Sequence, residues 1–187
     1  MDSTDLDLGA KWHDRPLCCR YLLAHFAVQE IQVRMAPAAH GWSVTWALGT
    51  FGDGQREALG AWPHSVDGVL NWHAVFDDLA TRGVERIRFV VGSSANAASA
   101  TLVHFTKLNS VVPTAQIGVP PAGLPPRLKR VADTAEVAAQ QMQAGLARMI
   151  HRHGSFESPH AALPFLAAAL QRLEKRARAR LTLSGRI

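Results

Sequence analysis

Long apolar runs are missing from this sequence of 187 residues, and cysteine is scarce. No run approaches the roughly 18 apolar residues of a membrane-spanning helix, which excludes an integral membrane protein. The acidic first residues have no apolar segment behind them, so we expect no signal peptide. The two cysteines, Cys18 and Cys19, are neighbours that rarely pair with each other and cannot form a zinc site alone, which favours a reduced, cytoplasmic setting. Hydrophobic residues at 48% and charged residues at 19% suit one globular domain, with or without a helical extension.

Charge is divided unevenly along the chain. Residues 127–187 hold eleven Lys and Arg against four Asp and Glu, a net charge of +7. The first 126 residues hold nine Lys and Arg against eleven Asp and Glu, a net charge of −2. The two parts sum to the formal net charge of +5. A basic C-terminal third on a near-neutral body favours a polyanionic partner such as nucleic acid, with a merely solvated helix face as the alternative.

The first half of the chain predicts a meander of three antiparallel strands. Apolar and β-branched residues without helical spacing mark strands at 21–33, 42–50 and 55–62. Gly52-Asp53-Gly54 predicts the hairpin turn between the second and third strands. Over residues 69–81 the spacing of apolar residues changes to that of a helix, which Gly83 is expected to end. Residues 87–91 predict a strand that is buried on both faces.

The second half predicts a helix over 95–107, a strand over 111–119 and then two long helices. Four prolines within residues 120–126 predict a stiff connector. Asp133 is the expected cap of a helix that runs to His153 and ends at Gly154. Ser158 and Pro159 open the last helix. We expect these two helices to dock on the sheet through apolar stripes, Val137, Leu146 and Ile150 in the first and Leu163, Leu166, Leu170 and Leu173 in the second.

Several short motifs, in order and at matching spacing, resemble the catalytic domain of mutator-type insertion-sequence transposases. They are Arg15-Pro16-Leu17, Ala47-Leu48-Gly49, the segment 53–60, Arg82-Gly83-Val84 and Gly154-Ser155-Phe156. The resemblance runs from about Trp12 to Arg178. It implies an α/β, ribonuclease H-like fold: a mixed sheet with a three-strand antiparallel meander, parallel strands and C-terminal helices. The expected division is a core at 1–119, a proline-rich connector at 120–131 and a basic helical pair at 132–187.

The resembled family cuts and joins DNA with two Asp and one Glu that hold two divalent metal ions. Counting from the matching motifs, the three positions fall on His25, Ser93 and Gln140, none of which is acidic. The nearest acid to the third position is Glu136, one helical turn away. The family's Cys and His after its next strand are also missing, from residues 118–121, and its large helical insertion is replaced by about twenty residues. The resemblance therefore predicts a shortened relative without the Mg²⁺ ligands, with no cofactor and no catalytic residue.

Each unusual residue also has a plainer interpretation. His25 is either a ligand for a soft metal in a repurposed site or a buried, hydrogen-bonded histidine in the space of a lost carboxylate, and we favour the second. Ser93 lacks the G-x-S-x-G frame and the acid that a catalytic serine needs. The five tryptophans are expected to pack in the core or at its edges.

The leading hypothesis is a catalytically inactive, transposase-derived protein that still binds DNA or a transposase complex. The candidate phosphate contacts are the basic residues of the last two helices: Arg148, His151, Arg152, His153, Arg172, Lys175, Arg176 and Arg178. The alternative is a protein-interaction module that forms a homo-oligomer or pairs with an intact transposase and poisons it. A new activity built on His25, Ser93 and Gln140 ranks third, and a decayed remnant without a role is the fourth outcome.

Overall fold

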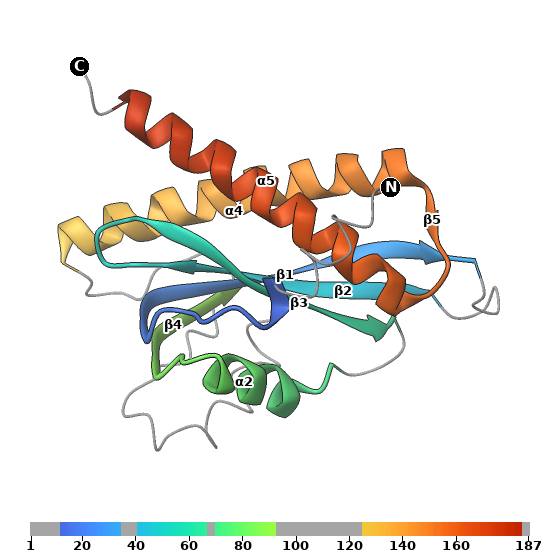
Figure 1. Ribbon diagram of the computed structural model, residues 1–187. Helices are drawn as coiled ribbons and strands as arrows, with labels where there is room; N and C mark the ends of the chain where they lie inside the picture. The colour runs from blue at the N-terminus through green and yellow to red at the C-terminus, as the bar shows by residue number, and fades with distance from the viewer. Residues whose placement is uncertain (1–11, 35–40, 67–69, 93–124, 185–187) are drawn as a thin grey trace.

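The computed structural model describes residues 12–34, 41–66, 70–92 and 125–184, and side chains as far as residue 177. Among these residues a twisted sheet forms the middle layer, with the helix at 72–81 on one face and the long helices at 126–153 and 159–184 on the other (Figure 1). None of the helices in these ranges is long and apolar enough to cross a membrane. The helix expected at 95–107 and the strand expected at 111–119 lie outside the described residues.

The sheet is built around its longest strand, β1, and has the order β3-β2-β1-β4. Strands β1 (Arg20–Val33), β2 (Trp42–Thr50) and β3 (Arg56–Ser65) form an antiparallel meander. Strand β4 (Arg86–Gly92) lies parallel to β1. The short β5 (Ser155–Phe156) pairs in parallel with the far end of β1. This mixed sheet confirms the α/β fold class and is compatible with the ribonuclease H-like order.

The turn between β2 and β3 is the expected glycine hairpin, because Gly54 has a φ of 91° and the Phe51 amide donates to the Gln55 carbonyl at 2.9 Å. A bulge follows in β3. Ala47 pairs with Gly60 and Leu48 with Ala58, which leaves one extra residue in β3. At the bulge the backbone of Ala58 bonds to two side chains. The Ala58 amide donates to the Glu174 carboxylate at 3.3 Å, and the Ala58 carbonyl accepts from the Arg15 guanidinium. The two side chains therefore fasten the bulge to the last helix and to the segment before β1.

Helix α2 (Trp72–Thr81) covers the lower face of the sheet in Figure 1. It begins three residues later than predicted, because the side chain of Asn71 accepts from the Ala74 amide at 3.2 Å and caps the helix there. Gly83, with a φ of 101°, follows its C-cap as expected. Its apolar face is buried against the sheet, namely Trp72, Val75, Phe76 and Leu79.

Helix α4 (Pro126–His153) begins seven residues before Asp133, so the expected cap at Asp133 is wrong and residues 126–131 are helical. A proline at the first helical position costs nothing, because its missing N–H would have no partner there. Leu146 and Ile150 are buried as predicted, but Val137 is 53% exposed. Val137 and Leu146 are nine residues apart, which at 3.6 residues per turn places them on opposite sides of the helix. The buried face of this part of α4 is formed by Ala135, Ala139 and Met142 instead.

Helix α5 (Pro159–Ser184) starts as predicted, with the Ser158 hydroxyl accepting from the Ala161 amide at 3.1 Å. Leu166 and Leu170 are fully buried, whereas Leu163 and Leu173 are only half-buried. One continuous core joins α4 and α5 to the upper face of the sheet, with Trp46, Leu48 and Leu146 at its centre. The long helices are thus part of the same packed body as the sheet.

Candidate functional site

His25 lies on β1, in the layer between the sheet and α4. Its register partners are Leu48 on β2 and Val91 on β4, so it sits on the central strand of the sheet. The residue is only 7% exposed. Its Nδ1 atom is 3.3 Å from Oε2 of Glu136 on α4, without the alignment of a hydrogen bond. Its ring centroid is 6.5 Å from that of Trp46.

Glu136 connects His25 to Gln140. The Nε2 atom of Gln140 donates to the Oε1 atom of Glu136 at 3.1 Å, a contact between residues four apart on one helix face. The structure therefore brings two of the three family positions, one from β1 and one from α4, to the same carboxylate. Ser93, the remaining position, lies outside the described residues.

Burial lowers the pKa of the His25 imidazole below its ordinary value, and the neighbouring Glu136 carboxylate partly opposes this. His25 is therefore neutral at pH 7.

The donor set of this cluster does not suit a pair of hard divalent ions. Mg²⁺ prefers anionic oxygen ligands, and two such ions need several carboxylates between them. Here Glu136 is the one carboxylate, next to a buried imidazole and an amide. Across the described ranges, no three His, Cys, Asp or Glu side chains are grouped so that they could hold a metal ion.

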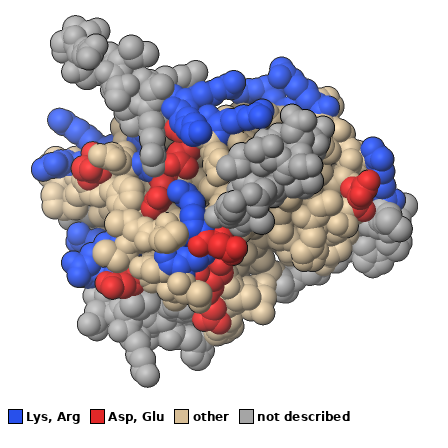
Figure 2. Space-filling model, viewed as in Figure 1, with Lys and Arg blue, Asp and Glu red and all other residues tan. Residues whose placement is uncertain are grey.

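The candidate phosphate contacts lie on the C-terminal turns of α4 and along α5. Arg148, His151, Arg152, His153, Arg172, Lys175 and Arg176 are all exposed, and we call this set the basic helical surface. Arg178 lies in the part of α5 whose side chains are not described. Figure 2 shows Lys and Arg side chains along the upper edge of the molecule, where Figure 1 places α4 and α5.

A groove with a volume of about 370 Å³ lies between α4 and α5 within this surface. It is lined by three basic residues (Arg152, His153 and Arg172) and by apolar ones (Met149, Pro164, Phe165, Ala168 and Ala169). The sequence singled out the basic residues, but it gave no reason to group them with Phe165. The missed signal is that Phe165 and Arg172 are seven residues apart and so share one side of α5.

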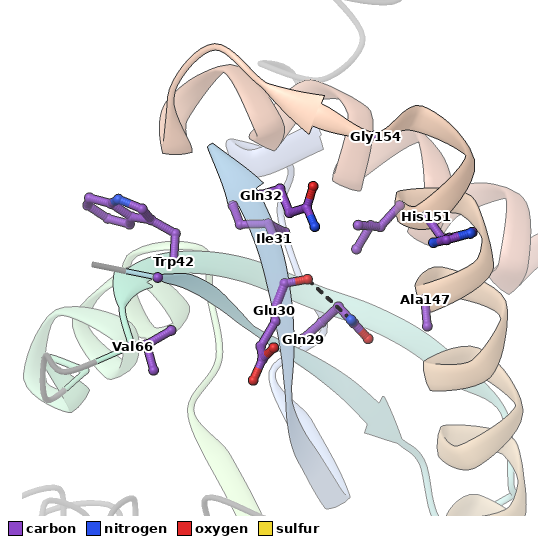
Figure 3. A pocket seen from close by; sticks show the side chains of 11 residues that line it. Gln29, Glu30, Ile31, Gln32, Trp42, Val66, Ala147, His151 and Gly154 are labelled. Carbon is purple, nitrogen blue, oxygen red and sulfur yellow. Dashed lines mark hydrogen bonds between the residues drawn. The ribbon is translucent and has the colours of Figure 1, made fainter. Parts of the chain in front are cut away.

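A second, larger hollow of about 630 Å³ lies between β1 and the end of α4. Figure 3 shows it with Trp42 and Val66 on one side and His151 of α4 on the other, and with Gln29 and Glu30 between them. The exposed carboxylate of Glu30 in this lining disfavours a phosphate group. The groove between α4 and α5 is therefore the better anion site of the two.

Gln143 is a polar residue that the sequence did not single out. Its amide nitrogen donates to the Val28 carbonyl at 2.8 Å and to Oε1 of Gln29 at 3.1 Å. Its amide oxygen accepts from the indole N–H of Trp46 at 2.7 Å. This one side chain thus joins α4 to both β1 and β2, beside the His25 cluster.

A mixed sheet of this order, with two long helices on one face, is compatible with the ribonuclease H-like class of fold. The model of the mutator family of transposases matches residues 3–106, more than half of the chain, so the chain belongs to that family. It is 31% identical over 91 residues to the transposase for insertion sequence element ISRM3 of Rhizobium meliloti strain 1021. It is 30% identical over 86 residues to the probable transposase for an ISRM3-like element of Sinorhizobium fredii. The matches cover 49% and 46% of this chain but only 23% and 22% of these relatives.

Proposed function

We propose that this chain is a catalytically inactive mutator-family protein that binds DNA through its basic helical surface. The observation that carries the first half is the cluster of His25, Glu136 and Gln140. It consists of a buried neutral ring on β1 (His25), a half-buried carboxylate on α4 (Glu136) and an exposed amide one helical turn further along α4 (Gln140). Cleavage and strand transfer need metal-held oxygens in line with the scissile bond, and this donor set cannot hold the metals.

The loss of Asp and Glu at all three family positions supports the same conclusion. His25 and Gln140 are neutral, and Ser93 is a weak ligand for a hard cation. Glu136 cannot replace the missing pair, because it is one residue and already contacts both His25 and Gln140. The expected boundary at residue 119, between the ribonuclease H-like core and the proline-rich connector, stays a prediction.

Charge and exposure support DNA binding. Residues 127–187 carry the net charge of +7, and the Lys and Arg side chains of the basic helical surface are exposed, so they can contact a phosphate backbone. Each phosphate that a Lys or Arg neutralises releases condensed counterions, which drives binding at low salt. Exposed cations at the C-terminal end of α4 also complement its helix dipole, so solvation alone is the competing explanation for them.

The test is a titration of labelled duplex DNA with purified protein at several salt concentrations, with Mg²⁺ present and the products separated on a gel. We expect intact DNA and binding that weakens steeply with salt. Arg148→Gln, Arg152→Gln and Arg176→Gln should each reduce the slope of log affinity against log salt by about 1. Arg86→Gln, at the exposed start of β4 and outside the basic helical surface, is the matched control and should leave the slope nearly unchanged.

Two results would overturn this proposal. Metal-dependent cleavage that Glu136→Gln abolishes would show that the cluster still works as an active site. Absence of binding at low salt would leave the basic helical surface as a solvated face.

The second candidate is a protein-interaction module, either a homo-oligomer or a partner of an intact transposase. The outward position of Val137, 53% exposed on α4, favours it. Within the described ranges, however, the exposed large hydrophobic residues are Val137 and Val66, which is little apolar surface for a stable interface. Light scattering of the wild type and of Val137→Glu tests the homo-oligomer, which predicts a dimer that Val137→Glu breaks. Co-purification with a co-expressed intact transposase tests the second form, and a strict monomer that does not co-purify would refute this candidate.

A further inference from the structure

The groove between α4 and α5 has a feature that contact with duplex phosphates does not require. Its cations, Arg152 and Arg172, stand beside apolar side chains that include Met149 and Phe165. A surface that only neutralises a phosphate backbone needs no apolar floor, because phosphates are fully hydrated anions. The lining instead suits a ligand with an anionic part and a flat apolar part.

Aromatic rings lead from the core to the surface at this groove. The His153 ring stacks on Phe156 with centroids 4.3 Å apart and an angle of 13°, and it lies 4.6 Å from the Phe165 ring. Phe156 is 3% exposed, whereas His153 is exposed and Phe165 half-buried. Because Phe156 is anchored in the core next to β1, the two outer rings are held in place. A fixed aromatic platform next to cations is the usual arrangement for stacking single-stranded bases.

The size of the groove fits the same ligand. Its volume of about 370 Å³ is at the small end of the roughly 300–1,000 Å³ typical for small organic groups. A paired base is held inside the duplex stack and cannot enter such a groove, whereas an unpaired or flipped base can. The named aromatic and aliphatic floor residues offer stacking in place of hydrogen-bond readout, so little sequence preference is expected.

We propose that this groove binds one unpaired nucleotide of DNA, at a strand end or next to a duplex. Arg152 and Arg172 hold the flanking phosphates, and the base lies against Phe165 and His153. The inference rests on the proposed DNA binding and adds that the protein prefers DNA with an unpaired strand over fully paired DNA.

The test is fluorescence anisotropy with three labelled probes of equal phosphate number. The first is a blunt duplex, the second a duplex with a short single-stranded overhang, and the third the same overhang without bases. We expect the overhang to bind about tenfold more tightly than the blunt duplex, and the abasic overhang to lose that gain, since stacking one base contributes about that factor.

Three variants locate the effect. Phe165→Leu keeps an apolar side chain but removes the ring, so the preference for the overhang should vanish while blunt-duplex binding stays. Ala168→Met fills the groove without removing any packing and should have the same effect, which covers the case that Phe165→Leu fails to fold. Lys175→Gln removes an exposed cation of α5 that does not line the groove, and it should weaken all three probes equally.

The outcomes separate this inference from the proposal on which it rests. Equal affinity for all three probes, or an abasic overhang that binds as tightly as the intact one, overturns the base site and leaves DNA binding standing. An overhang preference that survives both Phe165→Leu and Ala168→Met moves the site elsewhere and overturns the inference as well. Failure of every probe to bind at low salt overturns both.

Discussion

Replacing Gln143 by methionine tests how α4 is attached to the sheet. Methionine has a similar length and volume, so the packing changes little, but all three hydrogen bonds of the Gln143 amide are lost. Two of the partners would lose this hydrogen bond: the indole N–H of the fully buried Trp46 and the carbonyl of the half-buried Val28. A buried polar group that loses its hydrogen bond costs about 1–3 kcal/mol and a half-buried one less, so we expect a loss of about 1–4 kcal/mol in the free energy of unfolding.

The assay is urea unfolding followed by circular dichroism and tryptophan fluorescence. Gln141→Met is the matched control, because Gln141 is exposed on the same helix, and it should change stability by no more than about 0.5 kcal/mol. In a Trp46→Phe background the indole N–H is already gone, so Gln143→Met should cost less than in the wild type. A loss for Gln143→Met no larger than that for Gln141→Met would refute the reasoning.

Three further predictions concern stability. Because burial places the pKa of His25 below 6.5, the unfolded chain binds more protons in that range, and stability should fall as pH drops below about 6.5. His25→Asn should remove up to about 1.4 kcal/mol per pH unit of this dependence in unfolding titrations between about pH 7.5 and 5.5, and an unchanged pH profile would contradict it. Leu146→Ala should cost about 2–5 kcal/mol because the side chain is fully buried, whereas Val137→Ala on the opposite side of α4 should be nearly neutral by thermal melting. Gly154→Ala should cost about 1–3 kcal/mol from backbone strain alone, since φ is +84° and no atom lies within 4 Å of the added Cβ; an unaltered melting temperature would argue against it.

The sheet could be predicted from the sequence where local chemistry decides the structure. The bounds of β2 match the prediction, because alternating residues and the Gly52–Gly54 hairpin set both its faces and its end. The beginning of α4 could not be predicted in the same way. The proline cluster indicates a break, but Pro126 also fits the first turn of a helix, and packing against the sheet decides between the two.

The candidate site was only partly accessible to sequence reasoning. The resemblance supplied His25 and Gln140, which are 115 positions apart, but no spacing rule places Glu136 against His25. That contact depends on how α4 is rotated over β1, and the apolar residues of the helix alone allowed Val137 to be assigned to the wrong side. Gln143 was missed for a similar reason, since a polar residue in an amphipathic helix gives no sign of whether it is solvated or hydrogen-bonded to a strand.

The shared core of the sheet, α4 and α5 has a consequence for how the protein is made. The upper face of the sheet carries Val44, Trp46 and Leu48, yet Leu166 and Leu170, which cover it, come about a hundred residues after β3 ends. At about 5–20 residues per second, a ribosome needs roughly 5–20 seconds to synthesise that interval. During this time the nascent meander exposes an apolar face and long strand edges, which are the features that recruit chaperones or cause aggregation. Premature termination before α5 should therefore give an insoluble or degraded product, and folding should be completed only late in translation.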